Sequence, residues 1–171
     1  MDNGTLTLLL RLIHILAGAF WFGAAVLMAA FIVPTMRDTG REGGRFLQHL
    51  MQRRRLPIFF GIAMLLTILS GATMYGRIAA ATHGMWMRTH PGIAYGVGAL
   101  AAILAAITGP MMSGGAGRRM AVVGQSIGPS GPSPEQQQEL GRLQQRVVLG
   151  TRLAAGFLAI AAGAMAVARY L

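Results

Sequence analysis

Residues 12–33 read LIHILAGAFWFGAAVLMAAFIV, a continuous and mostly apolar run. The hydrocarbon core of a bilayer is about 30 Å thick, and roughly 20 apolar residues of α-helix cross it. Three later stretches are long and apolar enough to do the same: residues 56–75, 91–112 and 147–167. The sequence therefore predicts that residues 1–171 form one all-α membrane domain, a bundle of four transmembrane helices.

The composition also points to a bilayer. Of the 171 residues, 54% are hydrophobic, which is a high share for a soluble domain. The net charge of +10 comes from arginine, because the chain contains no lysine. These arginines cluster between the apolar stretches instead of following one face, so they favour a topology signal over a nucleic-acid footprint. We therefore expect the lipid bilayer, and no nucleic acid, as a partner.

Two further features of the composition restrict the chemistry. The chain has no cysteine, which excludes disulfides, thiolate-ligated iron–sulfur clusters and cysteine nucleophiles. The acidic residues all lie outside the predicted spans: Asp2, Asp38, Glu42, Glu135 and Glu139. No buried carboxylate is then available for acid–base catalysis or for coupling protons across a membrane. This pattern argues against an ordinary hydrolase and against a secondary transporter.

The arginines orient the predicted bundle. Those between spans one and two, and between spans three and four, are Arg37, Arg41, Arg45, Arg53, Arg54, Arg55, Arg118, Arg119, Arg142 and Arg146. Only Arg77 and Arg88 lie between spans two and three. By the positive-inside rule, both termini and the 76–90 loop face outward from a multi-pass plasma (inner) membrane protein. Tyr75, Tyr95 and Tyr170 fall near the same outer interface, as expected for aromatic anchors.

Proline marks the predicted helix boundaries. Pro34 is expected to end the first span, Pro57 and Pro91 to open the second and third, and Pro110 to close the third. The N-terminal Met1-Asp2-Asn3-Gly4 lacks the positive charge of a secretory signal, so the first apolar segment is expected to be a retained helix.

Two helices are expected to extend beyond the bilayer. Ser133, Pro134 and Gln136 predict a capped helix start, with the serine as N-cap and glutamine at the third helical position. If that helix continues into span four, it projects into the cytoplasm. Residues 45–51 are expected to extend span two in the same way. Such extensions are either a docking surface or solvated helix ends.

His14 is an ionisable residue inside the first span, where a polar side chain is costly and normally has a partner or a function. Gly18 and Trp21 share its helix face, and Arg11 lies one turn toward the outside. A histidine beside a glycine gap and an arginine suits a flat cofactor, with imidazole bound to iron and guanidinium to a propionate. A neutral histidine hydrogen-bonded to a neighbouring helix is an equally open interpretation.

His90 lies near the depth of His14. Arg11 marks the outer end of the hydrocarbon region, which places His14 about one turn inside it, and His90 precedes Pro91 at the outer end of span three. Two imidazoles on different helices near one membrane face are placed to ligate one metal centre. His49 lies on the cytoplasmic side and is expected to be solvated or interfacial.

The first helix carries a resemblance to a known group. The run His14-Ile-Leu-Ala-Gly-Ala-Phe-Trp21-Phe-Gly23 resembles the first helix of a superfamily of small four-helix membrane proteins. This superfamily includes proteins with the CopD-like copper-resistance domain and the HemJ-type protoporphyrinogen oxidases. The resemblance covers the layout of the whole chain, but the first-helix motif is its most specific part. The other matching segments are Pro34, Arg-Leu-Pro57 and Met165-Ala-Val-Ala-Arg169-Tyr170.

The resemblance implies a cofactor. HemJ-type oxidases are haem proteins thought to use the first-helix histidine and a lysine that follows a tryptophan by four residues. Here Trp86-Met-Arg-Thr-His90 has that spacing, with histidine in place of lysine. The resemblance thus implies a haem b held by His14 and His90 between helices one and three, near the outer face.

The expected role follows from that ligand pair. The family's lysine and the Asn-Glu pair of its last helix are absent, so a cytochrome-like role is expected instead of porphyrinogen oxidation. If the protein is an enzyme, the resemblance implies an oxidoreductase related to that oxidase. A bis-imidazole haem leaves no iron position open and suits electron transfer, with a membrane redox protein or a quinone as partner. The sequence is also compatible with a homo-oligomer.

The outer arginines are candidate propionate partners. They are Arg11, Arg77, Arg88 and Arg169. Each of them is equally interpretable as an interfacial arginine whose charged end reaches water.

Two other functions remain open. His83, Met85, Met87 and His90 combine thioethers and imidazoles, which suit Cu(I), and the CopD-like resemblance points to copper binding or transport too. The chain has 12 methionines, however, so a Met-x-Met pair arises easily by chance. The third interpretation is a structural subunit of a larger membrane complex, for which the extended helices would be the docking surface.

Overall fold

A computed structural model describes residues 3–128 and 131–171. Four of its helices are long and apolar enough to cross a membrane, which confirms the predicted number. They occupy Gly4–Asp38, Leu56–Ala81, His90–Gln125 and Pro134–Tyr170. The protein is therefore an all-α, multi-pass membrane protein by length and composition. The absence of a signal sequence was expected partly from Met1 and Asp2, which lie outside the described residues.

Three of these long helices are built from shorter segments, whereas Leu56–Ala81 is a single α-helix. The α-helices are α1 (Asn3–Leu27), α2 (Val33–Asp38), α3 (Arg41–Gln48), α4 (Leu56–Ala81), α5 (His90–Thr108), α6 (Gly115–Gln125) and α7 (Pro134–Val167). Between and after them lie the π-helical segments η1 (Met28–Ile32), η2 (His49–Arg53) and η4 (Gly109–Gly114), and the 3-10 turns η3 (Met85–Arg88) and η5 (Ala168–Tyr170).

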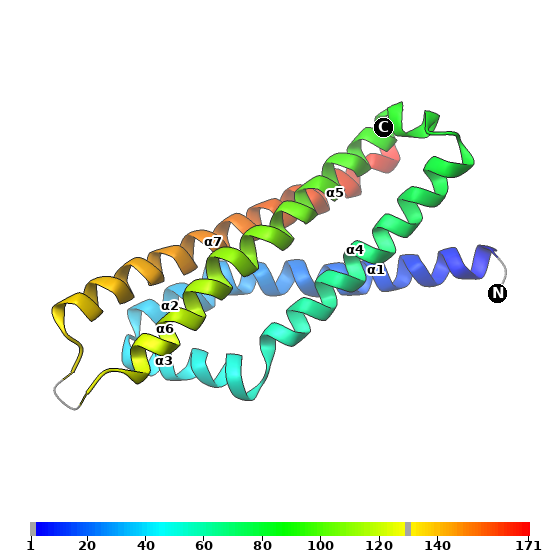
Figure 1. Ribbon diagram of the computed structural model, residues 1–171. Coiled ribbons are helices and arrows are strands. Elements are labelled where there is room, and N and C mark those ends of the chain that lie inside the picture. Colours follow the sequence, from blue (N-terminus) through cyan, green and yellow to red (C-terminus); the bar gives the residue numbers. More distant parts are fainter. Residues whose placement is uncertain (1–2, 129–130) are drawn as a thin grey trace.

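The helices form two pairs. The helix α5 packs along α7, and α1 packs against α4 (Figure 1). The two chain ends and the α4–α5 connection lie toward one end of the molecule, and α2, α3 and the α6–α7 connection lie toward the other (Figure 1). This arrangement agrees with four successive crossings.

Pro34 and Pro110 do not end their helices, contrary to the sequence-based expectation. Proline lacks an N–H and its ring clashes with the preceding turn of a regular α-helix. Here a π-helical stretch lies at each proline: η1 ends two residues before Pro34, and Pro110 lies inside η4. The wider π turn tolerates a proline without its backbone N–H. The chain therefore stays helical into α2 and α6.

Pro57 and Pro91 do open α4 and α5, as predicted. The predicted continuous extension of span two through residues 45–51 is wrong, however. That segment is helical, but Arg55 adopts a left-handed conformation with φ of 53° and separates η2 from α4. Pro57 favours the break, because its ring clashes with the preceding turn of a regular α-helix.

The predicted start of α7 is confirmed. The Ser133 side chain accepts a hydrogen bond from the Gln136 N–H, and the Gln136 side chain accepts one from the Ser133 N–H. This reciprocal cap satisfies two backbone donors that the helix itself leaves unpaired. The helix then runs unbroken into the fourth span. Its 34 residues correspond to about 51 Å at the α-helical rise.

Small residues form the centre of the bundle. Trp21 is 5% exposed and packs with buried alanines of α4, α5 and α7, among them Ala63, Ala105 and Ala161. Small side chains let membrane helices approach closely, because packing drives their association in lipid. The outward surface is apolar on every span, as Leu8 and Leu69 illustrate at 68% and 62% exposure. Such a surface suits lipid contact.

Candidate functional site

His14 lies at the contact between α1 and α4. Its Nδ1 atom is 2.8 Å from the Thr67 carbonyl oxygen and 3.2 Å from Ser70 Oγ. Thr67 and Ser70 are the buried polar residues of α4, at 8% and 3% exposure. The side chain of Ser70 also donates to a carbonyl of its own helix turn. A small polar cluster is thus enclosed between two apolar helices.

The Thr67 carbonyl decides which nitrogen of His14 carries the proton. A carbonyl oxygen only accepts hydrogen bonds, so Nδ1 must donate, and in the neutral imidazole Nε2 is then an unprotonated acceptor. Nε2 has no hydrogen-bond partner among the described residues, and none of their fully buried side-chain N or O atoms lacks a partner. Nε2 is therefore not fully buried.

Gly71 makes room for the His14 ring. A Cβ atom at Gly71 would lie 2.8 Å from His14 Cε1 and 3.1 Å from Nδ1, closer than ordinary van der Waals contact. At Gly18, one turn along α1, a Cβ would meet Thr67 Cγ2 at an ordinary 3.5 Å. The close approach at His14 therefore depends on Gly71 of α4 more than on Gly18, which sequence reasoning had selected.

The other residues assigned to the first-helix site lie in different surroundings. Trp21 is part of the buried alanine-rich core described above. Arg11 is exposed on α1. Gly18 lies beside Thr67 of the α4 face that holds His14, where an added Cβ atom would meet Thr67 Cγ2.

His90 starts α5, and its side chain is exposed. It makes no hydrogen bond to another described residue, and no described contact joins it to His14. Thr89 caps the helix, since its side chain accepts from the Gly92 N–H at 3.2 Å. Because α1 packs against α4 whereas α5 packs along α7, the structure does not show the two histidines facing one metal centre.

Trp86 lies in the α4–α5 connection and packs against two tyrosines. Its ring stacks on Tyr95 with a centroid separation of 5.9 Å and meets Tyr75 edge-on at 5.2 Å. Gly92 lies beneath the turn, where a Cβ atom would come within 2.1 Å of the Trp86 carbonyl oxygen. Trp86 therefore has a structural role in the loop, and the three rings form an aromatic cluster at one end of the bundle.

The alternative copper ligands lie in the same connection. His83 adopts a left-handed φ of 48°, and Met85 and Met87 are 73% and 44% exposed. Arg77 and Arg88 are exposed nearby. No group of three or more His, Cys, Asp or Glu side chains that could hold a metal ion occurs within residues 3–128 and 131–171.

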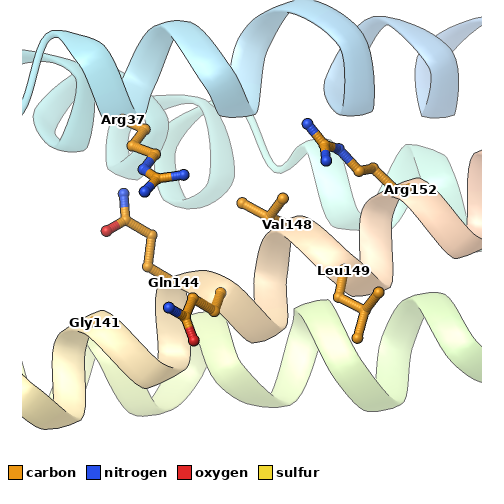
Figure 2. Close-up of a pocket in the computed structure, with 7 residues that line it drawn as sticks. Arg37, Gly141, Gln144, Val148, Leu149 and Arg152 are labelled. Atoms are coloured by element: carbon orange, nitrogen blue, oxygen red, sulfur yellow. The ribbon is translucent and has the colours of Figure 1, made fainter.

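Sequence reasoning missed Arg152. It lies inside the predicted fourth span, at residues 147–167, and is the one arginine within any of the four predicted spans. In the structure it lines a cavity of about 330 Å³ between α2 and α7, together with Arg37 and Gln144 (Figure 2). Its presence in an apolar span was the signal that could have found it, since intramembrane charges are rare and usually functional.

Comparison with known proteins identifies no relative. No family model matches the chain, and no curated protein or solved structure matches it. The resemblance to the CopD-like and HemJ-type superfamily therefore remains a prediction from the quoted residues.

Proposed function

We propose that this is a membrane-embedded haem b protein with an electron-transfer role, in which His14 binds haem iron through Nε2. The observation that carries the proposal is the hydrogen bond from Nδ1 of His14 to the Thr67 carbonyl. Metal-ligating histidines usually donate their other ring N–H to a carbonyl or carboxylate, which fixes the tautomer and orients the ring. His14 has this second contact, and its Nε2 is not fully buried.

The chain's own residues supply the ligand environment. Ser70 and the Thr67 carbonyl hold the imidazole, and Gly71 gives it space. His90 is the proposed second ligand, because its exposed imidazole has no hydrogen-bond partner among the described residues. The exposed Arg11 and Arg88 are proposed to pair with propionates. Bound haem would supply one-electron chemistry, with a membrane redox protein or a quinone as the proposed partner.

Absorption spectroscopy of the protein purified in detergent from haem-replete cells tests this proposal. We expect a Soret band and sharp α and β bands after reduction with dithionite. His14→Ala should abolish haem retention, because it removes the oriented ligand. His90→Ala should weaken retention or give a five-coordinate spectrum. His49→Ala is the matched control, since His49 is exposed in η2 beyond the arginine-rich end of α4.

A parent spectrum retained by both the His14 and His90 variants would refute the ligand assignment. A colourless preparation with stoichiometric copper by elemental analysis would favour copper binding instead.

One observation favours copper as the second candidate: the thioethers of Met85 and Met87 are exposed in one turn, within reach of the solvent. His83 and His90 flank that turn and would complete a soft ligand set for Cu(I).

We also propose that both termini face outward and that the arginine-rich loops lie in the cytoplasm, in the plasma (inner) membrane. The support is the distribution of arginine, together with the aromatic cluster of Trp86, Tyr75 and Tyr95 at the opposite end. In this orientation the first turns of α7 project from the membrane, because the helix exceeds the bilayer core of about 30 Å.

A further inference from the structure

The cavity at Arg152 is lined by charge from two separate parts of the chain. Arg152 and Gln144 come from α7, and Arg37 comes from α2. Arg37 and Gln144 extend toward each other across the cavity, and Arg152 extends from α7 toward the opposite helix (Figure 2). Two guanidinium groups lining one space repel each other unless an anion lies between them. The cavity is therefore suited to an anion.

The chain does not supply that anion. Neither arginine forms an ion pair in the described part of the chain, where the observed salt bridge joins Arg119 to Glu139 at 2.7 Å. None of the acidic residues lies inside a predicted span. A charged side chain within an apolar span costs several kcal/mol unless it is paired or reaches water. A counter-ion from outside the chain would reduce this cost.

A second cavity of about 330 Å³ adjoins the first through Arg152, which lines both. Its other lining residues come from α1, η1, α2 and α7, and all five are apolar: Val26, Ala29, Ala30, Pro34 and Ala155. The side chains of Val26 and Ala30 are exposed, so this groove opens toward the lipid-facing surface. A polar, cationic space thus continues into an apolar one.

The depth of Arg152 suits the phosphate level of a bilayer leaflet. Arg152 lies five residues inside the predicted span that begins at residue 147, about 7 to 8 Å along the helix. A long arginine side chain bridges such a depth while its guanidinium reaches toward the interface. The helix α2, which carries Arg37 in its last turn, lies at the end of the molecule with α3, in the arginine-rich region between the first two spans (Figure 1). Headgroup phosphate and acyl chain meet at this level.

We propose that the groove between α2 and α7 binds one anionic phospholipid, with its phosphate between Arg37 and Arg152 and an acyl chain along Val26, Ala30 and Ala155. Arginine binds phosphate through paired N–H donors, and the Gln144 amide adds a neutral donor. The apolar cavity is the feature that favours a lipid over free phosphate, because inorganic phosphate has nothing to bury there.

Native mass spectrometry of the full chain in detergent tests this site. The probes are phosphatidylglycerol, phosphatidylcholine with the same acyl chains, and soluble glycerol phosphate. We expect one phosphatidylglycerol per chain, bound more tightly than phosphatidylcholine, and no binding of glycerol phosphate at the same concentration. Arg152→Gln and Arg37→Gln should each weaken phosphatidylglycerol binding about tenfold, the effect of losing one charge-assisted hydrogen bond.

Arg146→Gln is the matched control, because Arg146 is exposed on α7 and does not line either cavity. An equal loss of binding in this variant would show general attraction to a basic surface and would overturn the proposal. Equal binding of phosphatidylcholine would also overturn it. Binding of glycerol phosphate as strongly as of lipid would replace the lipid site with a free-phosphate site. Since Arg37 is exposed on a short helix, Arg37→Gln tests the site even if Arg152→Gln fails to fold.

Discussion

At the scale of single residues, the contacts of His14 show a partner on a neighbouring helix, and haem ligation by His14 stays a proposal. The hydrogen bond to the Thr67 carbonyl is the contact expected of a neutral histidine paired with a neighbouring helix. In the neutral imidazole the same bond places the proton on Nδ1 and leaves the Nε2 lone pair for a metal. The interpretations therefore differ in what Nε2 contacts. The sequence identified His14 because it is a polar residue in a span, but its partners lie on another helix and have no signal near it in the chain.

Gly71→Ala tests how tightly the His14 ring is held. The new methyl group would lie 2.8 Å from Cε1, so the ring must move and the bond to Thr67 should weaken. We expect a loss of stability of about 1–3 kcal/mol, the usual cost of inserting a methyl group into a filled site. If His14 binds haem, the ratio of Soret absorbance to protein should fall as well. Thermal unfolding in detergent and the absorption spectrum measure the two effects.

Gly76→Ala is the control for this variant, because a Cβ atom there meets nothing within 4 Å on the same helix. It should leave the unfolding temperature and the haem content unchanged. Equal behaviour of the two alanine variants would contradict the close contact between His14 and Gly71.

At the scale of elements, local chemistry predicted helix starts better than helix ends. Ser133 with Gln136, and the prolines at positions 57 and 91, act within one helical turn, so the sequence alone located those starts. Pro34 and Pro110 misled the prediction because a π-helical stretch accommodates each proline. Whether a proline ends a helix or is absorbed depends on packing by other helices, which a single segment does not encode.

Gly92→Ala tests the α4–α5 connection. The Cβ atom would lie 2.1 Å from the Trp86 carbonyl oxygen, and backbone atoms there cannot yield as a flexible side chain would. The turn should shift, disturbing the Trp86 contacts with Tyr75 and Tyr95. We expect a destabilisation of about 1–3 kcal/mol and a red-shifted tryptophan emission.

Gly96→Ala provides the comparison on the same helix, where a Cβ atom would approach only the Tyr75 hydroxyl at 3.4 Å. It should have a much smaller effect on both measurements. An unchanged unfolding temperature for Gly92→Ala would show that the turn is not held as described.

At the scale of the whole molecule, the number of spans followed from hydropathy, whereas the sites between helices did not. Apolar length is a property of each segment, so four crossings were predictable. Arg152 was missed because one charge does not stop a segment from qualifying as a span. Its significance appears when α2 brings Arg37 to the same cavity. The contacts of His14 likewise form between two helices, since its hydrogen-bond partners Thr67 and Ser70 both lie on α4.

The absence of cysteine makes the orientation of the bundle directly testable. Single variants Met85→Cys and Gln138→Cys place one thiol at each end of the molecule, at positions whose side chains are exposed. If the arginine-rich loops are cytoplasmic, a membrane-impermeant maleimide should label the Met85 variant in intact cells and the Gln138 variant only after permeabilisation. The unsubstituted protein is the background control, because it has no thiol to react. The reverse labelling pattern would invert the proposed topology and place Arg37 and Arg152 in the outer leaflet. The lipid groove would keep its chemistry in that case, because its residues and cavities do not depend on which side is cytoplasmic.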